Sequence, residues 1–171
     1  MSRTLVSNIL RFILLIPLQV LVLDNINLGG SVNPYLYVLF ILLLPFEIPG
    51  WAMLFLSFFM GLGVDMFSGT PGMHAAASTL MAFVRPLVIR SVGISRDIDP
   101  GMEPSIASMG FSWFFMYALI LVFIHHFALF TIEVFRLSGL FSVFLRTLYS
   151  TLLTMALIII MQYLFGKPSR K

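Results

Sequence analysis

Two ionisable side chains, Asp65 and His74, lie close together in the sequence on either side of a glycine-rich turn, in the stretch FFMGLGVDMFSGTPGMH. An ionised side chain at membrane depth costs about 2.5–3.5 kcal/mol on insertion scales, so it is normally kept where a partner or a polar cavity receives it. If Asp65 ends one helix and His74 begins the next, the two side chains lie at one level and could share a hydrogen bond or an ion pair, with proton or substrate handling as the functional role. The alternative is structural, with Asp65 capping the turn or locking the two helices together.

The other polar residues offer little for catalysis or metal binding. The adjacent His125 and His126 point about 100° apart on a helix, so they cannot bind one ion from one face, and we expect them at a helix end near the interface. The chain has no GxSxG elbow, HExxH helix, P-loop or pair of intramembrane aspartates. It also has no cysteine, which excludes cysteine-based metal sites. We therefore expect no enzyme, no catalytic residue, no cofactor and no metal.

The composition indicates an integral membrane protein. Hydrophobic residues make up 60% of the 171 residues, charged residues make up 10%, and the mean hydropathy is +1.03. A soluble domain has about 25% charged residues. The net charge of +3 comes from cationic residues placed beside apolar runs, which membrane topology explains better than nucleic-acid binding. We expect the lipid bilayer as a partner and no nucleic acid.

The hydropathy pattern predicts an all-α membrane protein with a single transmembrane domain over residues 1–171, a bundle of about six helices. The predicted spans are 5–23, 34–45, 50–67, 73–90, 106–130 and 147–165. The apolar run from residue 34 to 66 would measure about 50 Å as one helix, against a hydrocarbon core of about 30 Å, so the chain must reverse at the prolines around Glu47. A re-entrant fourth segment, short and rich in small residues, would leave five spans.

The distribution of basic residues predicts the orientation. Six spans with both termini inside place most Lys and Arg residues in or near the cytoplasm, as the positive-inside rule favours. Asp65 then lies near the external end. The polar loop 91–104, which contains Arg96 and Asp97, is the expected cytoplasmic contact surface.

Small residues around the glycine-rich turn predict close helix contact. Gly61 lies one turn before Asp65 on the same helical face, so a neighbouring helix can approach closely there. Ala76 belongs to a run of small residues in the fourth predicted span. We expect Gly61 and Ala76 to border an intramembrane groove that receives a partner helix.

The chain resembles the MreD family of bacterial rod-shape-determining membrane proteins over nearly its whole length. The resemblance is carried by an N-terminal helix that opens with arginine, by the hairpin at residues 45–49, and above all by GLGVD at 61–65 and GTPGMHA at 69–75. Gly61, Asp65 and Gly72 correspond to recurrent positions of that family. The resemblance implies that they are structural or partner-contact residues, not catalytic ones.

This resemblance implies a non-enzymatic scaffold in the bacterial inner membrane that links the elongation machinery to lateral peptidoglycan synthesis and maintains cell shape. The implied partners are MreC, the actin-like MreB filament, RodA and its class B penicillin-binding transpeptidase. The family is also similar in fold to the substrate-binding subunits of energy-coupling-factor vitamin transporters. The alternative is therefore a small-molecule transporter subunit with a ligand near its external mouth. A third hypothesis, an intramembrane enzyme using Asp65 and His74, has no substrate that the sequence names.

Overall fold

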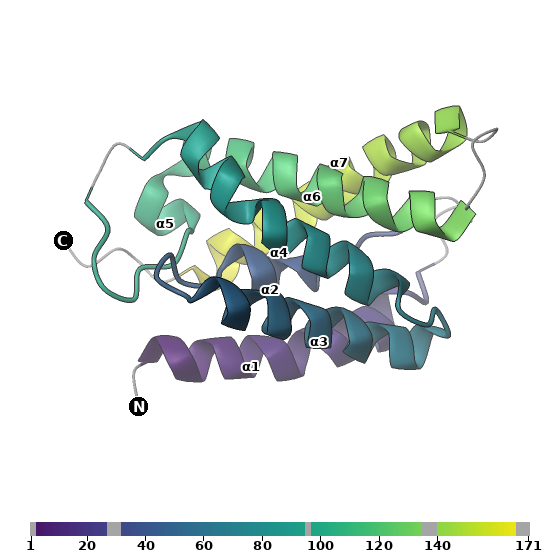
Figure 1. Cartoon of the computed structure of the whole chain (residues 1–171), viewed down its shortest axis with the longest axis horizontal. Coiled ribbons are helices and arrows are strands. Elements are labelled where there is room, and N and C mark those ends of the chain that lie inside the picture. The colour runs from purple at the N-terminus through teal and green to yellow at the C-terminus, as the bar shows by residue number, and fades with distance from the viewer. Residues whose placement is uncertain (1–2, 27–31, 95–96, 135–139, 167–171) are drawn as a thin grey trace.

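The computed structural model describes residues 3–26, 32–94, 97–134 and 140–166, and every regular element in these ranges is helical (Figure 1). In chain order the elements are α1 (Arg3–Leu18), the π-helical turn η1 (Gln19–Leu23), α2 (Val38–Leu42), α3 (Gly50–Ser68), α4 (Met73–Val92), α5 (Ile106–Met109), α6 (Phe111–Val134) and α7 (Leu140–Phe165). The all-helical fold class is confirmed.

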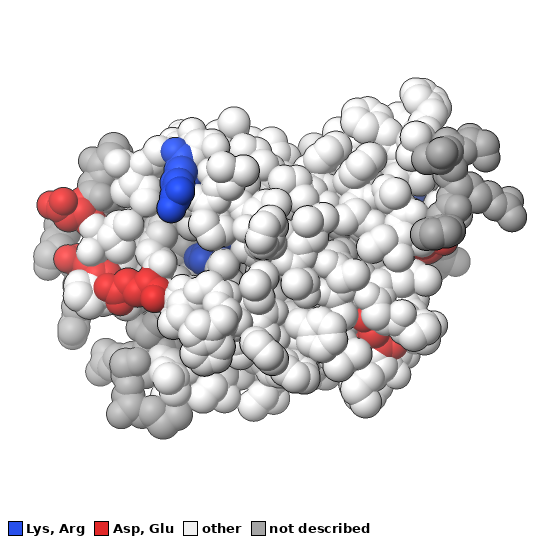
Figure 2. All heavy atoms as spheres, viewed as in Figure 1, with Lys and Arg blue, Asp and Glu red and all other residues white. Residues whose placement is uncertain are grey.

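Five of these helices are long and apolar enough to cross a membrane, namely α1 with η1, α3, α4, α6 and α7. They have 19 to 26 residues each. On the face shown in Figure 2, charged side chains lie towards the two ends of the molecule and a wide middle band has none. The chain is therefore a multi-pass membrane protein. We name the two ends of the bundle after the exposed Glu47 before α3 and the buried Asp65 near the end of α3.

The second predicted span, 34–45, is wrong as a membrane-spanning helix. Every residue from Pro34 to Leu44 is buried, and only the five residues of α2 are α-helical. We call residues 32–46 the central segment. It returns the chain through the interior, so α1 and α3 run in the same direction, from the Glu47 end to the Asp65 end (Figure 1). The irregular backbone of this segment is tolerated because protein, rather than lipid, surrounds it.

Side chains of the surrounding helices satisfy the backbone of the central segment towards the Asp65 end. The Gln19 side-chain amide donates to the carbonyl oxygen of Pro34 and accepts from the Leu36 amide, both at 2.9 Å. The Tyr35 amide donates to Thr154 Oγ1 of α7 at 3.1 Å. Non-helical backbone at membrane depth requires such partners, because no water is present to replace them.

The Glu47 end of the central segment depends on a buried arginine of α4. Arg85 is 2% exposed, and its guanidinium donates to the carbonyl oxygen of Leu44. Its Nε also donates to the Tyr117 hydroxyl at 2.7 Å, and that hydroxyl donates to the carbonyl oxygen of Leu42 at 3.0 Å. Among the described residues no carboxylate forms an ion pair with Arg85. Its positive charge is therefore stabilised by the dipoles of a backbone carbonyl and a hydroxyl group.

Two other predicted boundaries also change. Gly110, at a φ of 85°, ends α5 and separates it from α6, so the predicted span 106–130 is not one continuous helix. The last helix begins at Leu140 rather than at residue 147. The fourth span is a helix of 20 residues, which rules out the re-entrant alternative at that place. Of the predicted spans, it is the second, 34–45, that does not form a membrane-spanning helix.

Helices α3 and α4 approach each other most closely at Gly61. A Cβ atom on Gly61 would lie 2.4 Å from the carbonyl oxygen of His74 and 2.6 Å from Cα of Ala75. Both are backbone atoms, so neither can rotate away. The close approach predicted from the small residue is therefore present, and it belongs to the interior of this protein.

We expect Gly61→Ala to lower the free energy of unfolding in detergent by about 1–3 kcal/mol, the usual cost of overpacking. Gly50→Ala is the matched control on the same helix, because a Cβ there meets nothing within 4 Å. Its effect should stay within about 1 kcal/mol. Equal stability of the two variants would contradict this packing.

Candidate functional site

Asp65 caps the helix that follows it in the chain. Its Oδ1 accepts from the His74 amide at 3.0 Å and from the Thr70 hydroxyl at 2.9 Å, and its Oδ2 accepts from the Ala75 amide at 2.9 Å. Gly72, the N-cap residue directly before α4, has a φ of 83°, a backbone conformation that favours glycine. A carboxylate at this position satisfies free amides and complements the helix dipole. Asp65 therefore has a structural role, which is one of the two considered from the sequence.

The expected side-chain bond between Asp65 and His74 is absent from the hydrogen bonds of the described residues, since Asp65 reaches only the His74 backbone. The His74 ring instead pairs with Tyr37 of the central segment. The Tyr37 hydroxyl lies 2.9 Å from Nδ1 of His74 and 2.7 Å from Nε2 of His125. Both His125 and His126 are fully buried within α6, so their predicted place at a helix end near the interface is wrong.

The groove expected between Gly61 and Ala76 is not found. The backbone of α4 fills the space at Gly61, and Ala76 is exposed on the outer side of α4. Asp97 is exposed in the loop before α5, whereas Arg96 lies outside the described residues. The predicted contact residues therefore do not form one site.

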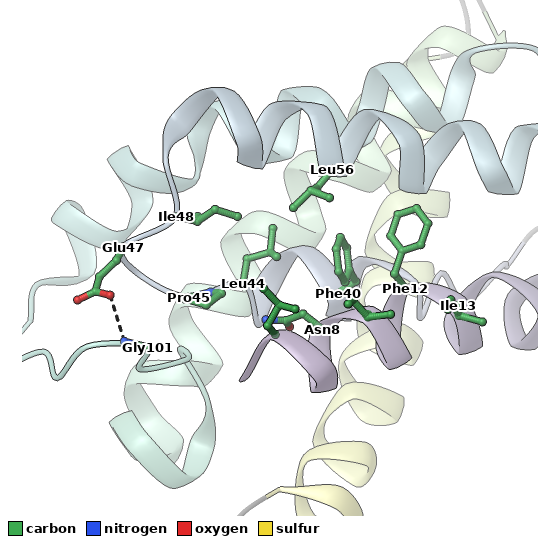
Figure 3. A pocket seen from close by; sticks show the side chains of 12 residues that line it. Asn8, Phe12, Ile13, Phe40, Leu44, Pro45, Glu47, Ile48, Leu56 and Gly101 are labelled. Atoms are coloured by element: carbon green, nitrogen blue, oxygen red, sulfur yellow. Dashed lines mark hydrogen bonds between the residues drawn. The ribbon is translucent and has the colours of Figure 1, made fainter. Parts of the chain in front are cut away.

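A different groove lies between α1 and α3 (Figure 3). It has a volume of about 660 Å³ and is largely apolar. Its walls include Ile9 and Phe12 of α1, Phe40 and Leu44 of the central segment, and Leu56 of α3. Only 11% of the α1–η1 span is buried, compared with 33% to 44% of the other four spans. The first helix is thus held at the edge of the bundle, and space is left beside it.

One acidic residue, Glu47, lies at one end of this groove, and two more lie in the neighbouring loop. Glu47 lines the groove and accepts a hydrogen bond from the Gly101 amide at 3.1 Å, as drawn in Figure 3. Asp97 and Asp99, in the same loop as Gly101, are exposed. Figure 2 shows acidic side chains at that end of the molecule, with a Lys or Arg side chain near them and further acidic side chains at the other end. We call Glu47, Asp97 and Asp99 the acidic rim.

A second groove, of about 490 Å³, lies along other residues of α1 and contacts α7. Arg11 of α1 lines it and forms an ion pair of 2.7 Å with Glu103. Both side chains are about one-fifth exposed, at 24% and 18%, so water screens the pair only in part. This ion pair and Gln19 attach the first helix to the bundle through polar contacts.

Within the part of the chain that the structure describes, no three His, Cys, Asp or Glu side chains are grouped to hold a metal ion. Sequence reasoning missed three buried polar residues that bond the central segment, Arg85, Gln19 and Thr154. Each of them interrupts an apolar helix, and that interruption was the available signal.

No family model, curated protein or solved structure matches this chain. The groove beside α1, its acidic rim and the polar interior are the features of this chain that bear on its function. The resemblance described above supplies candidate partners for this arrangement.

We expect Asp65→Ala to lower the free energy of unfolding by about 1–3 kcal/mol, because buried amides of α4 lose their acceptor. Asp97→Ala, at an exposed position, is the control and should change stability by about 0.5 kcal/mol or less. Denaturant unfolding of both variants in one detergent measures the difference. A fully stable Asp65→Ala protein would show that the cap does not support the fold.

Proposed function

We propose that this chain is a non-enzymatic membrane scaffold that receives the single transmembrane helix of a partner protein in the groove between α1 and α3. The observation that carries the proposal is an apolar groove of about 660 Å³ that ends at an acidic rim. The resemblance to the MreD family makes MreC, with one transmembrane helix, the candidate partner.

The charge at the end of the groove favours a helix over a lipid. A single-span protein carries an excess of Lys and Arg on the cytoplasmic flank of its helix. Such a flank would meet Glu47 and the exposed Asp97 and Asp99, whereas an anionic lipid headgroup would be repelled there. Exposed apolar side chains on both walls, such as Ile9 at 43% and Leu56 at 37%, supply packing surface for the incoming helix.

The resemblance to the MreD family also suggests the orientation of the chain and its further partners. The Glu47 end faces the cytoplasm of a bacterial cell, with both termini on that side of the inner membrane. There the scaffold links MreB to RodA and the class B penicillin-binding transpeptidase, and so directs lateral peptidoglycan synthesis. The exposed acidic residues of the loop before α5 are the natural contacts for cytoplasmic partners.

A second candidate function, the substrate-binding subunit of a small-molecule transporter, is favoured by one separate observation. A polar cavity of about 490 Å³ lies at the Asp65 end and is lined in part by His74. This alternative requires an energising ATPase partner. Recovery of such a module with the purified protein would support the transporter and count against the scaffold.

The scaffold proposal predicts that filling the groove abolishes partner binding. Ile9→Trp combined with Leu56→Trp places two large side chains in it. We expect at least a tenfold loss of an MreC-like single-span protein in affinity purification from mildly solubilised membranes. Leu152→Trp on α7 is the matched control, since Leu152 is 56% exposed and does not line this groove.

The proteins recovered in this purification decide whether the groove binds the partner helix. Loss of the partner from the groove variant alone supports the proposal, provided that both variants elute as single species in size-exclusion chromatography. Full recovery of the partner with the groove variant overturns it. Recovery only of further copies of this chain, in place of another protein, would also overturn it.

A further inference from the structure

The cavity at the Asp65 end is polar and is separate from the groove beside α1. Its volume is about 490 Å³, and its polar lining includes Asp24, Tyr35, Thr70, His74, Glu133 and Arg146. These residues come from η1 and its C-cap, the central segment, the α3–α4 turn, α4, α6 and α7. Parts of the chain that are distant in sequence therefore converge on one space.

His74 offers this cavity a nitrogen that has no protein partner. The residue is 4% exposed, and its Nδ1 is bonded to the Tyr37 hydroxyl. Its Nε2 has no hydrogen-bond partner among the described residues, although the ring lines the cavity. This nitrogen is not among the fully enclosed unpaired atoms, so a ligand group in the cavity can pair with it.

Tyr37 determines whether that nitrogen donates or accepts. Its hydroxyl has one hydrogen and lies between Nδ1 of His74 and Nε2 of His125, so it donates to one ring and accepts from the other. Nδ1 of His125 is fully buried without a partner. If Tyr37 donated to His125, a neutral ring would leave an N–H group unpaired there, and such orphaned donors are rare.

The favoured arrangement therefore has Nε2–H of His125 donating to Tyr37 and Tyr37 donating to Nδ1 of His74. A neutral His74 then carries its hydrogen on Nε2. His74 thus presents a hydrogen-bond donor to the cavity. Arg146 also lines the cavity, and its guanidinium is a second donor group. The matching ligand group is an acceptor such as a carboxylate.

The charges in the cavity call for a cation as well. Arg146 and Glu133 form an ion pair of 2.9 Å and balance each other. The Asp24 carboxylate accepts from Gln19 Nε2 at 2.8 Å and from Ser68 Oγ at 2.9 Å, both neutral donors. Among the described residues no Lys, Arg or His forms an ion pair with Asp24. The Asp24 carboxylate is exposed and has no ion pair among these residues, so the ammonium group of a ligand can reach it.

We propose that this cavity binds a small solute of the amino-acid class, whose ammonium group faces Asp24 and whose carboxylate accepts hydrogen bonds from Nε2 of His74 and from Arg146. A cavity of this volume is within the usual range for small-molecule sites, about 300–1,000 Å³. The site does not depend on the groove, so it holds whether or not a partner helix binds beside α1.

Calorimetric titration of the protein in lipid nanodiscs with the standard amino acids, one at a time, tests the proposal. We expect saturable binding of at least one. Two matched probes, an alkylamine and an alkyl carboxylate with the side chain of the bound amino acid, should each bind at least tenfold more weakly, because each lacks one of the two charged groups.

Variants assign the binding to this cavity. Asp24→Asn keeps the shape of an exposed side chain and should weaken binding at least tenfold, as should His74→Leu if that protein folds. Two controls should bind the amino acid as the unaltered protein does. They are Asp97→Asn, at the other end of the bundle, and the groove variant with Ile9→Trp and Leu56→Trp. Absence of saturable binding by every amino acid, or unchanged binding by Asp24→Asn, overturns the proposal.

Discussion

The hydrogen bonds to the central segment are the interaction on which the rest of the structure depends. This segment crosses the interior with only five α-helical residues, so several of its backbone groups have no partner within a helix. In the membrane interior each unsatisfied group costs several kcal/mol. Gln19, Arg85, Tyr117 and Thr154 supply the missing partners from η1, α4, α6 and α7. The surrounding helices are thus held around the segment by polar bonds as well as by apolar packing.

The same segment builds the functional surfaces. Phe40 and Leu44 form the inner wall of the groove beside α1, and Tyr35 lines the cavity at the Asp65 end. Tyr37 lies between His74 and His125 and fixes which nitrogen faces that cavity. One internal segment therefore contributes to both the groove and the cavity.

The sequence predicted the features that depend on local chemistry. Composition indicated a multi-pass membrane protein, the prolines around Glu47 indicated a reversal, and the small side chain of Gly61 indicated a close helix contact. Asp65 was expected either to cap a helix or to handle protons, and the structure shows the cap.

The central segment could not be predicted, because an apolar run has the same composition whether lipid or protein surrounds it. Its partners are also distant in sequence: Pro34 bonds a residue 15 positions away, and Tyr35 bonds one 119 positions away. For the same reason no local pattern predicts the partners of Arg85, which are Leu44 of the central segment and Tyr117 of α6. Hydrogen bonds between backbone groups and side chains that are distant in sequence leave no short sequence motif.

Amide hydrogen exchange at Leu36 tests this central claim most directly. In the unaltered protein the amide donates to Gln19 Oε1 at 2.9 Å. In Gln19→Leu we expect its exchange to rise at least about tenfold, because the hydrogen bond left unmade costs about 1–3 kcal/mol, while amides in the middle of α6 keep their protection. Unchanged exchange at Leu36 in a folded Gln19→Leu protein would show that the side chains around the central segment do not hold it in place.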